Sequence, residues 1–231
     1  MNNDSKTQVY SYIISLERAK HRFNYAKYLT TKIKNMRLFS AIDYLNNPRF
    51  DELCCKYRVK INKGHAGCAL SHIILLENFI ISDQKYMIVL EDDCVINYPL
   101  PINNAQVEYM FNCIKLRSIL QIDILYLNKR TLFNKYYRVI GGCGTEGYLV
   151  TKHGAKKLLA SLIELDQPID LRWLAHFPEY ENKSALSPVY PKLSINAYHS
   201  HITIVDTKDS NISYVNGHID NTDSDNVQTC K

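Results

Sequence analysis

The segment Tyr86–Asp93 constrains the fold of this chain more than any other, because an apolar run passes directly into three carboxylates with no turn residue between them. An apolar run of this length is typical of a central strand in a parallel sheet that is covered on both faces. Ligands of open α/β sheets bind at the carboxyl ends of such strands. We therefore expect a buried strand whose end places the acids at a ligand-binding edge.

The three acids at this strand end have a chemistry of their own. Adjacent carboxylates repel one another unless a cation or solvent screens their charge, and hard oxygen ligands suit Mg²⁺ or Mn²⁺. In an extended backbone Glu91 and Asp93 point to one side and Asp92 to the other, so two of them can serve one ion. The alternative is a solvated acidic strand end, because charged residues are mostly exposed.

Composition indicates one domain with a distinct C-terminal tail. With 231 residues, 46% of them hydrophobic, the chain can bury a substantial core, and we expect a single domain over residues 1–205. Residues 206–231 hold five Asp and two Lys, a net charge of −3. Because the whole chain has a formal net charge of +5, residues 1–205 carry +8. We expect this polar acidic tail to be mobile.

The charge of residues 1–205, the body of the chain, indicates the kind of partner, and the cysteines indicate the compartment. A basic body suggests anionic partners such as a nucleotide diphosphate or a phosphorylated lipid, whereas the lack of a dense Lys/Arg run interleaved with aromatics argues against nucleic acid. The seven cysteines form no CxxC pair and predict reduced thiols. Residues 1–8 are polar and show no export signal. We therefore expect a cytoplasmic protein.

Strand and helix patterns alternate along the chain, as in α/β proteins. A weakly periodic segment over residues 46–62 predicts an irregular or short-helical loop that covers the site. Thr151 is a candidate N-cap for the helix that follows it. The expected strands are 9–15, 36–42, 86–91, 122–127 and 148–150, and the expected helices are 17–33, 69–82, 105–120 and 152–163.

A glycine-bearing segment, Gly64–His72, stands before the apolar helix expected at 69–82. A helix start with glycines presents free N–H groups, which favours phosphate. Cys68 and His72 are four residues apart and could share one helix face as metal ligands, but two ligands make a poor zinc site. The ordinary alternative is a hydrogen-bonded core histidine beside a small buried thiol.

Five motifs stand in order along the chain: Tyr12–Arg18 with Arg22, Ala41–Asp43, Gly67–His72, Leu90–Asp93, and Gly144–Tyr148 with Gly154 and Ala155. This ordered set resembles glycosyltransferase family 25, over about residues 9–170. The resemblance implies a GT-A fold, an α/β nucleotide-binding sandwich with a central, mostly parallel sheet. It also implies a divalent metal, Mn²⁺ or Mg²⁺, and a UDP-sugar donor from which a hexose is transferred with inversion. The family includes lipooligosaccharide and collagen galactosyltransferases, so the expected reaction moves galactose from UDP-galactose onto a saccharide or glycolipid acceptor.

The resemblance assigns roles to the acids after the apolar strand. Asp93 would bind the metal directly, while Glu91 or Asp92 would contact it through water or hold the ribose. Independently of the family, a departing diphosphate develops negative charge that a cation stabilises.

Three further residues lie at the ends of the first two expected strands, where such folds bind uracil and ribose: Ser15, Arg18 and Asp43. Arg18 could also reach a phosphate with two hydrogen bonds. The alternative for these residues is a charge at a helix start and an aspartate in a turn.

An inverting transfer needs a base that accepts the proton of the acceptor hydroxyl. Pro168–Asp170 matches a Pro-x-Asp pattern of the family, so Asp170 is the first candidate base and Glu146 the second. The alternative for Asp170 is a simple helix-start acid. His199 and His201 are candidates for a further metal ligand from the C-terminal half, or for ordinary surface packing.

Two departures from the family pattern affect recognition, because His65 stands where an acid is common and Tyr44 where a glycine is common. Besides the transferase, two hypotheses remain: a nucleotide-sugar or glycan-binding protein without a base, and a metal-dependent phosphohydrolase. An aspartyl-phosphate mechanism needs a nucleophilic Asp at the strand end, where this chain has Glu91. A lipid acceptor would place the protein at the periphery of a membrane, on its inner face.

Overall fold

A computed structural model describes residues 8–115, 121–142, 144–180, 193–200 and 204–207. Strands and helices alternate along most of this chain, as the sequence pattern predicts. The elements are β1 (Tyr10–Ser15), α1 (Lys20–Lys32), β2 (Met36–Ser40), α2 (Phe50–Lys56), α3 (Lys63–Ile81), β3 (Tyr86–Glu91), β4 (Cys94–Ile96), α4 (Asn104–Lys115), β5 (Ile124–Tyr126), β6 (Leu132–Phe133), β7 (Val139–Gly141), β8 (Gly147–Thr151), α5 (Lys152–Ala160), α6 (Ile169–Leu174), β9 (Ala197–His199) and β10 (Val205–Thr207).

The main sheet has six strands in the order β2-β1-β3-β8-β5-β9. The pairs β1–β2, β1–β3 and β5–β9 are parallel, whereas β8 runs antiparallel to both β3 and β5. This mixed, mostly parallel sheet with helices on both faces is an α/β fold of the GT-A type, as expected. The reversal at β8 sets Gly147 opposite Leu90, so the chain that enters β8 lies beside the acidic end of β3.

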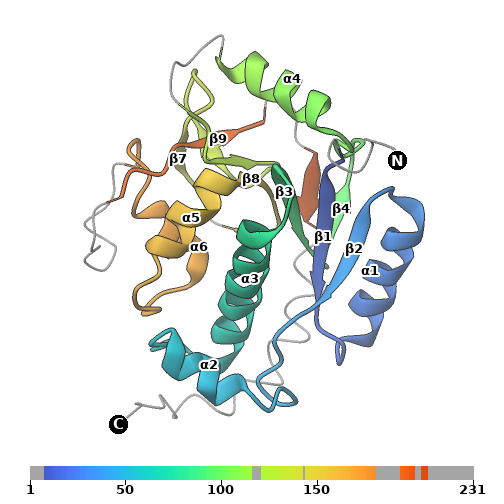
Figure 1. Ribbon diagram of the computed structural model, residues 1–231, viewed down its shortest axis with the longest axis vertical. Helices are drawn as coiled ribbons and strands as arrows, with labels where there is room; N and C mark the ends of the chain where they lie inside the picture. The colour runs from blue at the N-terminus through green and yellow to red at the C-terminus, as the bar shows by residue number, and fades with distance from the viewer. Residues whose placement is uncertain (1–7, 116–120, 143, 181–192, 201–203, 208–231) are drawn as a thin grey trace.

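Two apolar layers cover the sheet, because successive side chains of a strand point to opposite faces. Ile88 and Leu90 of β3 pack with residues of α1 and α4, whereas Met87 and Val89 pack with α3, α5 and α6. Figure 1 shows α3, α5 and α6 together on one side of the sheet and α1 and α4 away from them. Residues 86–90 are all buried, which confirms the prediction of a central strand covered on both faces.

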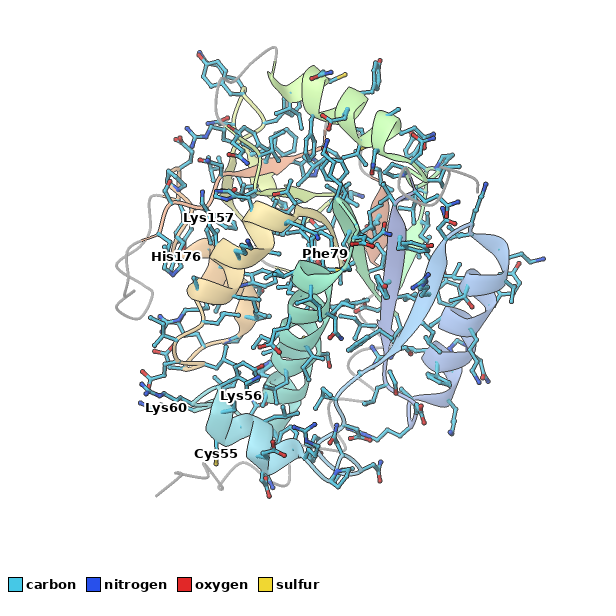
Figure 2. The ribbon with its side chains drawn as sticks, in the orientation of Figure 1. Cys55, Lys56, Lys60, Phe79, Lys157 and His176 are labelled. Carbon is cyan, nitrogen blue, oxygen red and sulfur yellow. The ribbon has the colours of Figure 1, made fainter. Side chains whose placement is uncertain are left out.

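Helix α3 begins six residues earlier than the pattern predicted, because Asn62 caps it by accepting the N–H of His65. The glycine-bearing segment therefore forms its first turns. Phe79 lies on α3 near the end that meets the sheet (Figure 2). By length and composition α3 could cross a membrane, but 56% of the apolar window is buried within the protein, as in the core helix of a globular domain.

Several local predictions can be compared directly with the structure. Thr151 caps α5, since its hydroxyl accepts the N–H of Gly154 at 2.9 Å. The segment 46–62 contains a short helix, α2, and the hairpin of β6 and β7 was not foreseen. The expected start of the tail at residue 206 falls inside β10, and residues 208–231 lie outside the described residues.

The cysteines differ in part from the expectation. Four of the described cysteines are free thiols: Cys54, Cys68, Cys94 and Cys113. Cys55, on α2 (Figure 2), is disulfide-bonded, so the expectation that every thiol is reduced is wrong for this residue.

Candidate active site

The carboxylates at the end of β3 turn to opposite sides, as alternation along a strand predicts. Glu91 faces α3, where its Oε1 lies 3.2 Å from Nε2 of His72 and accepts the hydroxyl of Thr145. Asp92 faces α1, where it accepts the hydroxyl of Ser15 at 2.7 Å and pairs with Arg22 at 3.1 Å. Each of these two acids is therefore held in a defined orientation.

Asp93, which follows them, is held differently. Its Oδ1 is buried and has no hydrogen-bond partner among the described residues. Burial, and then the charges of Glu91 and Asp92, raise the pKa of Asp93 to about 7. A carboxylate in such surroundings gains from a nearby cation, which would offset both the burial and the repulsion.

The pKa values of the other two acids are displaced in opposite directions. Burial raises the pKa of Asp92, and the opposing effects of Arg22 and Ser15 do not cancel it. Burial also acts to raise the pKa of Glu91, but the hydrogen bond and charge of His72 outweigh it, so that the pKa is lowered. Glu91 is therefore the acid that the surrounding side chains most favour in the ionised form.

A cavity of about 220 Å³ lies beside β1, β2 and the start of α3. Cationic, acidic and aromatic side chains line it, and Cζ of Arg18 lies 5.5 Å from the ring centre of Tyr44. All five residues that the sequence predicted for nucleotide binding line it: Ser15, Arg18, Asp43, Glu91 and Asp92. The structure thus brings these side chains together.

Arg18 and Asp43 also fit the alternative prediction, a charge at a helix start and an aspartate in a turn. Arg18 Nε lies 3.2 Å from Oδ1 of Asp43, and Asp43 accepts the backbone N–H of Leu45 at 3.1 Å. Asp43 therefore stabilises the turn after β2 while its carboxylate faces the cavity. The two interpretations of Asp43 are compatible.

A second cavity, of about 340 Å³, contains both candidate bases, Asp170 and Glu146, together with Asp93. Cys68 and Glu91 line both cavities. The two cavities therefore adjoin at the carboxylate cluster.

The candidate bases are in unequal environments. Glu146 is buried, accepts Nδ2 of Asn128 at 2.9 Å and pairs with Arg130, and burial raises its pKa. Asp170 lies in the first turn of α6 and lines the cavity. No hydrogen bond or ion pair joins its carboxylate to the described residues. The carboxylate of Asp170 therefore has no partner among the described residues, whereas that of Glu146 is already engaged.

The two C-terminal histidines do not contribute a described ligand. His199 is buried on β9, its Nε2 lies 2.7 Å from the carbonyl oxygen of Asn128, and its ring stacks on Phe133. Burial lowers its pKa, and it lines neither cavity. His201, predicted as a metal ligand, lies outside the described residues.

Four further residues shape the site; His72 and Thr145 lie in motifs that the sequence marked, whereas Asn128 and Arg130 were missed. His72 and Thr145 hold Glu91, and Asn128 and Arg130 hold Glu146. The signal for His72 was its spacing from Cys68, which predicted a shared helix face. No local pattern marked Asn128 and Arg130, because their partner, Glu146, is distant in the chain.

The donor set fits a hard divalent cation. Carboxylate oxygens of Asp93 and Glu91 line one cavity, and the buried Oδ1 of Asp93 lacks a partner among the described residues. Oxygen donors of this kind suit Mn²⁺ or Mg²⁺.

The sheet and the acid cluster between two cavities define an α/β protein of the GT-A type. Residues 8–173 match the family described as glycosyltransferase family 25 (LPS biosynthesis protein). Because the match covers most of the chain, the protein belongs to glycosyltransferase family 25, and the resemblance seen in the sequence is confirmed.

Individual relatives are more distant. A proposed glycosyltransferase of Haemophilus influenzae is 25% identical over 179 residues, which are 70% of this chain and 60% of that protein. The chain thus spans about 60% of the length of that curated relative.

Two solved structures are similar in outline. A glycosyltransferase involved in the glycosylation of the major capsid of PBCV-1 has 11% identity, a TM-score of 0.42 and coverage of 91% of this chain and 98% of its own. A Drosophila β1,4-galactosyltransferase 7 variant in complex with manganese, UDP-Gal and xylobiose has 10% identity, a TM-score of 0.39 and coverage of 96% and 76%. At these TM-scores neither likeness bears on the argument.

Proposed function

We propose that this protein is a metal-dependent inverting glycosyltransferase that moves a hexose, with UDP-galactose as the first candidate donor, onto a saccharide or glycolipid acceptor such as lipooligosaccharide. The observation that carries the proposal is the carboxylate cluster shared by two adjoining cavities, in which Asp93 Oδ1 is buried with no hydrogen-bond partner among the described residues. Membership of the family supports the reaction class.

The cavity beside β1 and β2 is the proposed donor site. Its aromatic wall, Tyr44, and its acid, Asp43, suit a nucleoside, and the guanidinium of Arg18 suits a diphosphate. Gly64 and Gly67, in the first turns of α3, also line this cavity, and the N-terminus of a helix favours phosphate.

The acids between the cavities are the proposed metal site. Asp93 and Glu91 would hold Mn²⁺ or Mg²⁺, with Asp92 turned toward Ser15 and the donor site. When bound, such a cation stabilises the negative charge that develops on the departing diphosphate.

Asp170 is the proposed base. Its carboxylate lines the second cavity and lacks a hydrogen-bond or ion-pair partner among the described residues, so it can accept the proton of an acceptor hydroxyl. Inversion requires the acceptor hydroxyl to attack the anomeric carbon on the face opposite the departing diphosphate, and we propose the second cavity as the acceptor site. Glu146, held by Arg130, would shape the wall of the acceptor site.

The hairpin of β6 and β7 supports a lipid-linked acceptor. It begins two residues after Arg130, which lines the second cavity, and it exposes large apolar side chains beside Lys135. Apolar and cationic groups together suit an anionic membrane surface. We therefore propose that the enzyme is peripheral to a membrane, on its inner, cytoplasmic face. The exposed apolar residues are Leu132, Phe133, Tyr136 and Ile140.

A nucleotide-sugar or glycan-binding protein is the second candidate. The observation that favours it is the engagement of Glu146 by Asn128 and Arg130, which leaves Asp170 as the one free acid among the candidate bases. If Asp170 does not act as a base, the site binds a donor without turnover.

The test measures UDP release from a panel of UDP-sugars with and without Mn²⁺, for the wild type, Asp93→Ala and Asp170→Ala. Asp51→Asn, an exposed acid on α2, is the matched control. We expect Mn²⁺-dependent release from one donor, lost in Asp93→Ala and retained in the control. Calorimetric UDP binding without turnover on any donor and acceptor would favour the binding protein, and release of inorganic phosphate from simple esters would favour a phosphohydrolase.

A further inference from the structure

A second group of potential metal ligands lies on the α3 side of Glu91. The ligand atoms of Cys68, His72 and Glu91 are all within 4.8 Å of one another. Cys68 and His72 are one turn apart on α3, and Glu91 comes from the end of β3. The two residues on the helix alone make a poor zinc site, and it is the packing of α3 on β3 that adds the third ligand.

We propose that Cys68, His72 and Glu91 form a binding site for a thiophilic divalent cation of the Zn²⁺ type, separate from the all-oxygen site at Asp93 but sharing Glu91 with it. Thiolate, imidazole and carboxylate are the three ligand types that Zn²⁺ takes from proteins, and three protein ligands with one open position are typical of accessible zinc sites. All three residues line the cavity beside β1 and β2, and Cys68 and Glu91 also line the second cavity.

The imidazole of His72 is oriented for this role. Its Nδ1 lies 3.0 Å from the hydroxyl of Tyr148, and its Nε2 is directed at Glu91. The ring is fully buried and packs edge-on against Trp173. A ligating histidine almost always makes a hydrogen bond through its other ring nitrogen, which fixes the tautomer and the ring orientation.

The other two ligands are accessible and positioned. Cys68 is exposed, and both it and Glu91 line the two cavities, so an ion can reach them from solvent. Thr145 donates its hydroxyl to Oε1 of Glu91 and holds the carboxylate near the imidazole. On binding, Nε2 of neutral His72 and the thiolate of Cys68 donate to the ion, and the thiol proton passes to solvent.

The two sites select different metals. Thiolate and imidazole favour Zn²⁺ over Mn²⁺, whereas carboxylate oxygens suit Mn²⁺ and Mg²⁺. Because Glu91 is common to both, Zn²⁺ at Cys68 would draw this carboxylate away from Asp93 and oppose Mn²⁺ binding there. Inhibition of the Mn²⁺-dependent reaction by Zn²⁺ would follow, and this consequence rests on the proposed function. The Zn²⁺ site itself does not rest on it.

The test titrates the metal-free protein with Co²⁺ and follows the sulfur-to-cobalt charge-transfer absorption in the near ultraviolet. Cys68→Ser removes the proposed thiolate, and Cys113→Ser, a half-buried free thiol on α4, is the matched control. We expect the band in the wild type and in Cys113→Ser, its absence in Cys68→Ser, and its loss when one equivalent of Zn²⁺ is added. Competition with a chromogenic chelator should show Zn²⁺ affinity at least about tenfold weaker in Cys68→Ser.

A wild type without the band, or a band that survives in Cys68→Ser, would overturn the proposal. This readout is independent of UDP release. If the band depends on Cys68 but no UDP-sugar is turned over, the Zn²⁺ site stands and the proposed transferase fails; Mn²⁺-dependent UDP release without the band gives the reverse result.

Discussion

His72 Nε2 lies 3.2 Å from Glu91 Oε1, although the two residues come from a helix and a strand. The same ring meets the hydroxyl of Tyr148 through Nδ1, so one imidazole joins α3 to two strands of the sheet. This arrangement orients Glu91 at the boundary between the two cavities. The buried hydroxyl of Tyr148 and the half-buried carboxylate of Glu91 thus share His72 as a partner.

Replacing that side chain should therefore be costly. In His72→Leu the buried hydroxyl of Tyr148 and the half-buried carboxylate of Glu91 lose a partner, and we expect the free energy of unfolding to fall by about 1–3 kcal/mol. Urea denaturation followed by circular dichroism measures the change. His65→Ala, an exposed histidine on the same helix, should stay within about 0.5 kcal/mol of the wild type. Equal losses in both variants would show that His72 has no special structural role.

Asp93→Asn should stabilise the metal-free protein at high pH. The folded pKa of Asp93 is about 7, above its usual 3.8, so the native state holds this proton more tightly than the unfolded state. The contribution of Asp93 to stability is therefore complete below pH 3.8 and declines as the pH rises to about 7. Asn keeps the shape and carries no charge, so its advantage should grow by about 1–3 kcal/mol between pH 5 and pH 8. Urea denaturation with EDTA at both pH values gives this difference, and an advantage that does not change with pH contradicts it.

With Mn²⁺ present, the wild type should be more stable than Asp93→Asn. A ligand that binds only the native state stabilises it according to its concentration and affinity. We expect the thermal midpoint of the wild type to rise with Mn²⁺ and that of Asp93→Asn to respond little, as measured by differential scanning fluorimetry. An equal rise in both proteins would place the Mn²⁺ site elsewhere.

Asp170→Asn should separate catalysis from donor binding. Loss of a general base typically lowers the rate by about 10²–10⁴-fold. Because Asp170 makes no hydrogen bond or ion pair with the described residues, the fold and UDP affinity should be retained. Initial rates and calorimetric UDP binding test both statements together. A kcat close to that of the wild type would remove Asp170 from the reaction.

Two glycines of α3 provide a matched pair for the donor cavity. A Cβ at Gly67 would lie 2.5 Å from the carbonyl oxygen of Ile42, whereas one at Gly64 would meet only Oδ1 of Asn62, at 3.6 Å. Gly67→Ala must push α3 away from the chain after β2, and we expect a loss of about 1–3 kcal/mol in stability together with weaker UDP binding. Gly64→Ala should be neutral or gain up to about 1 kcal/mol from helix propensity. Urea denaturation and UDP calorimetry on both variants decide, and similar behaviour of the two would refute the close approach.

Local patterns in the sequence determined the elements that depend on local physics. The apolar run of β3, the apolar composition of α3 and the cap at Thr151 follow from burial and from hydrogen bonds between near neighbours. Alternation along β3 also predicted that Glu91 and Asp92 would point to opposite sides. Helix ends and the short hairpin of β6 and β7 were less predictable. Single residues decide where such elements begin, as the cap at Asn62 does for α3, and they give a weaker signal than a long apolar run.

Only the tertiary structure decided how distant residues meet. The antiparallel pairing of β8 with β3 places Gly147 opposite Leu90, and so brings Thr145 and Glu146 beside the acids of β3. The packing of α3 on the sheet supplies His72 to Glu91, and α6 brings Asp170 into the same cavity as Asp93. Strand direction and helix packing depend on contacts between segments far apart in the chain, which no local pattern encodes. The sequence by itself therefore determined the acids of the site, whereas the fold determined their partners.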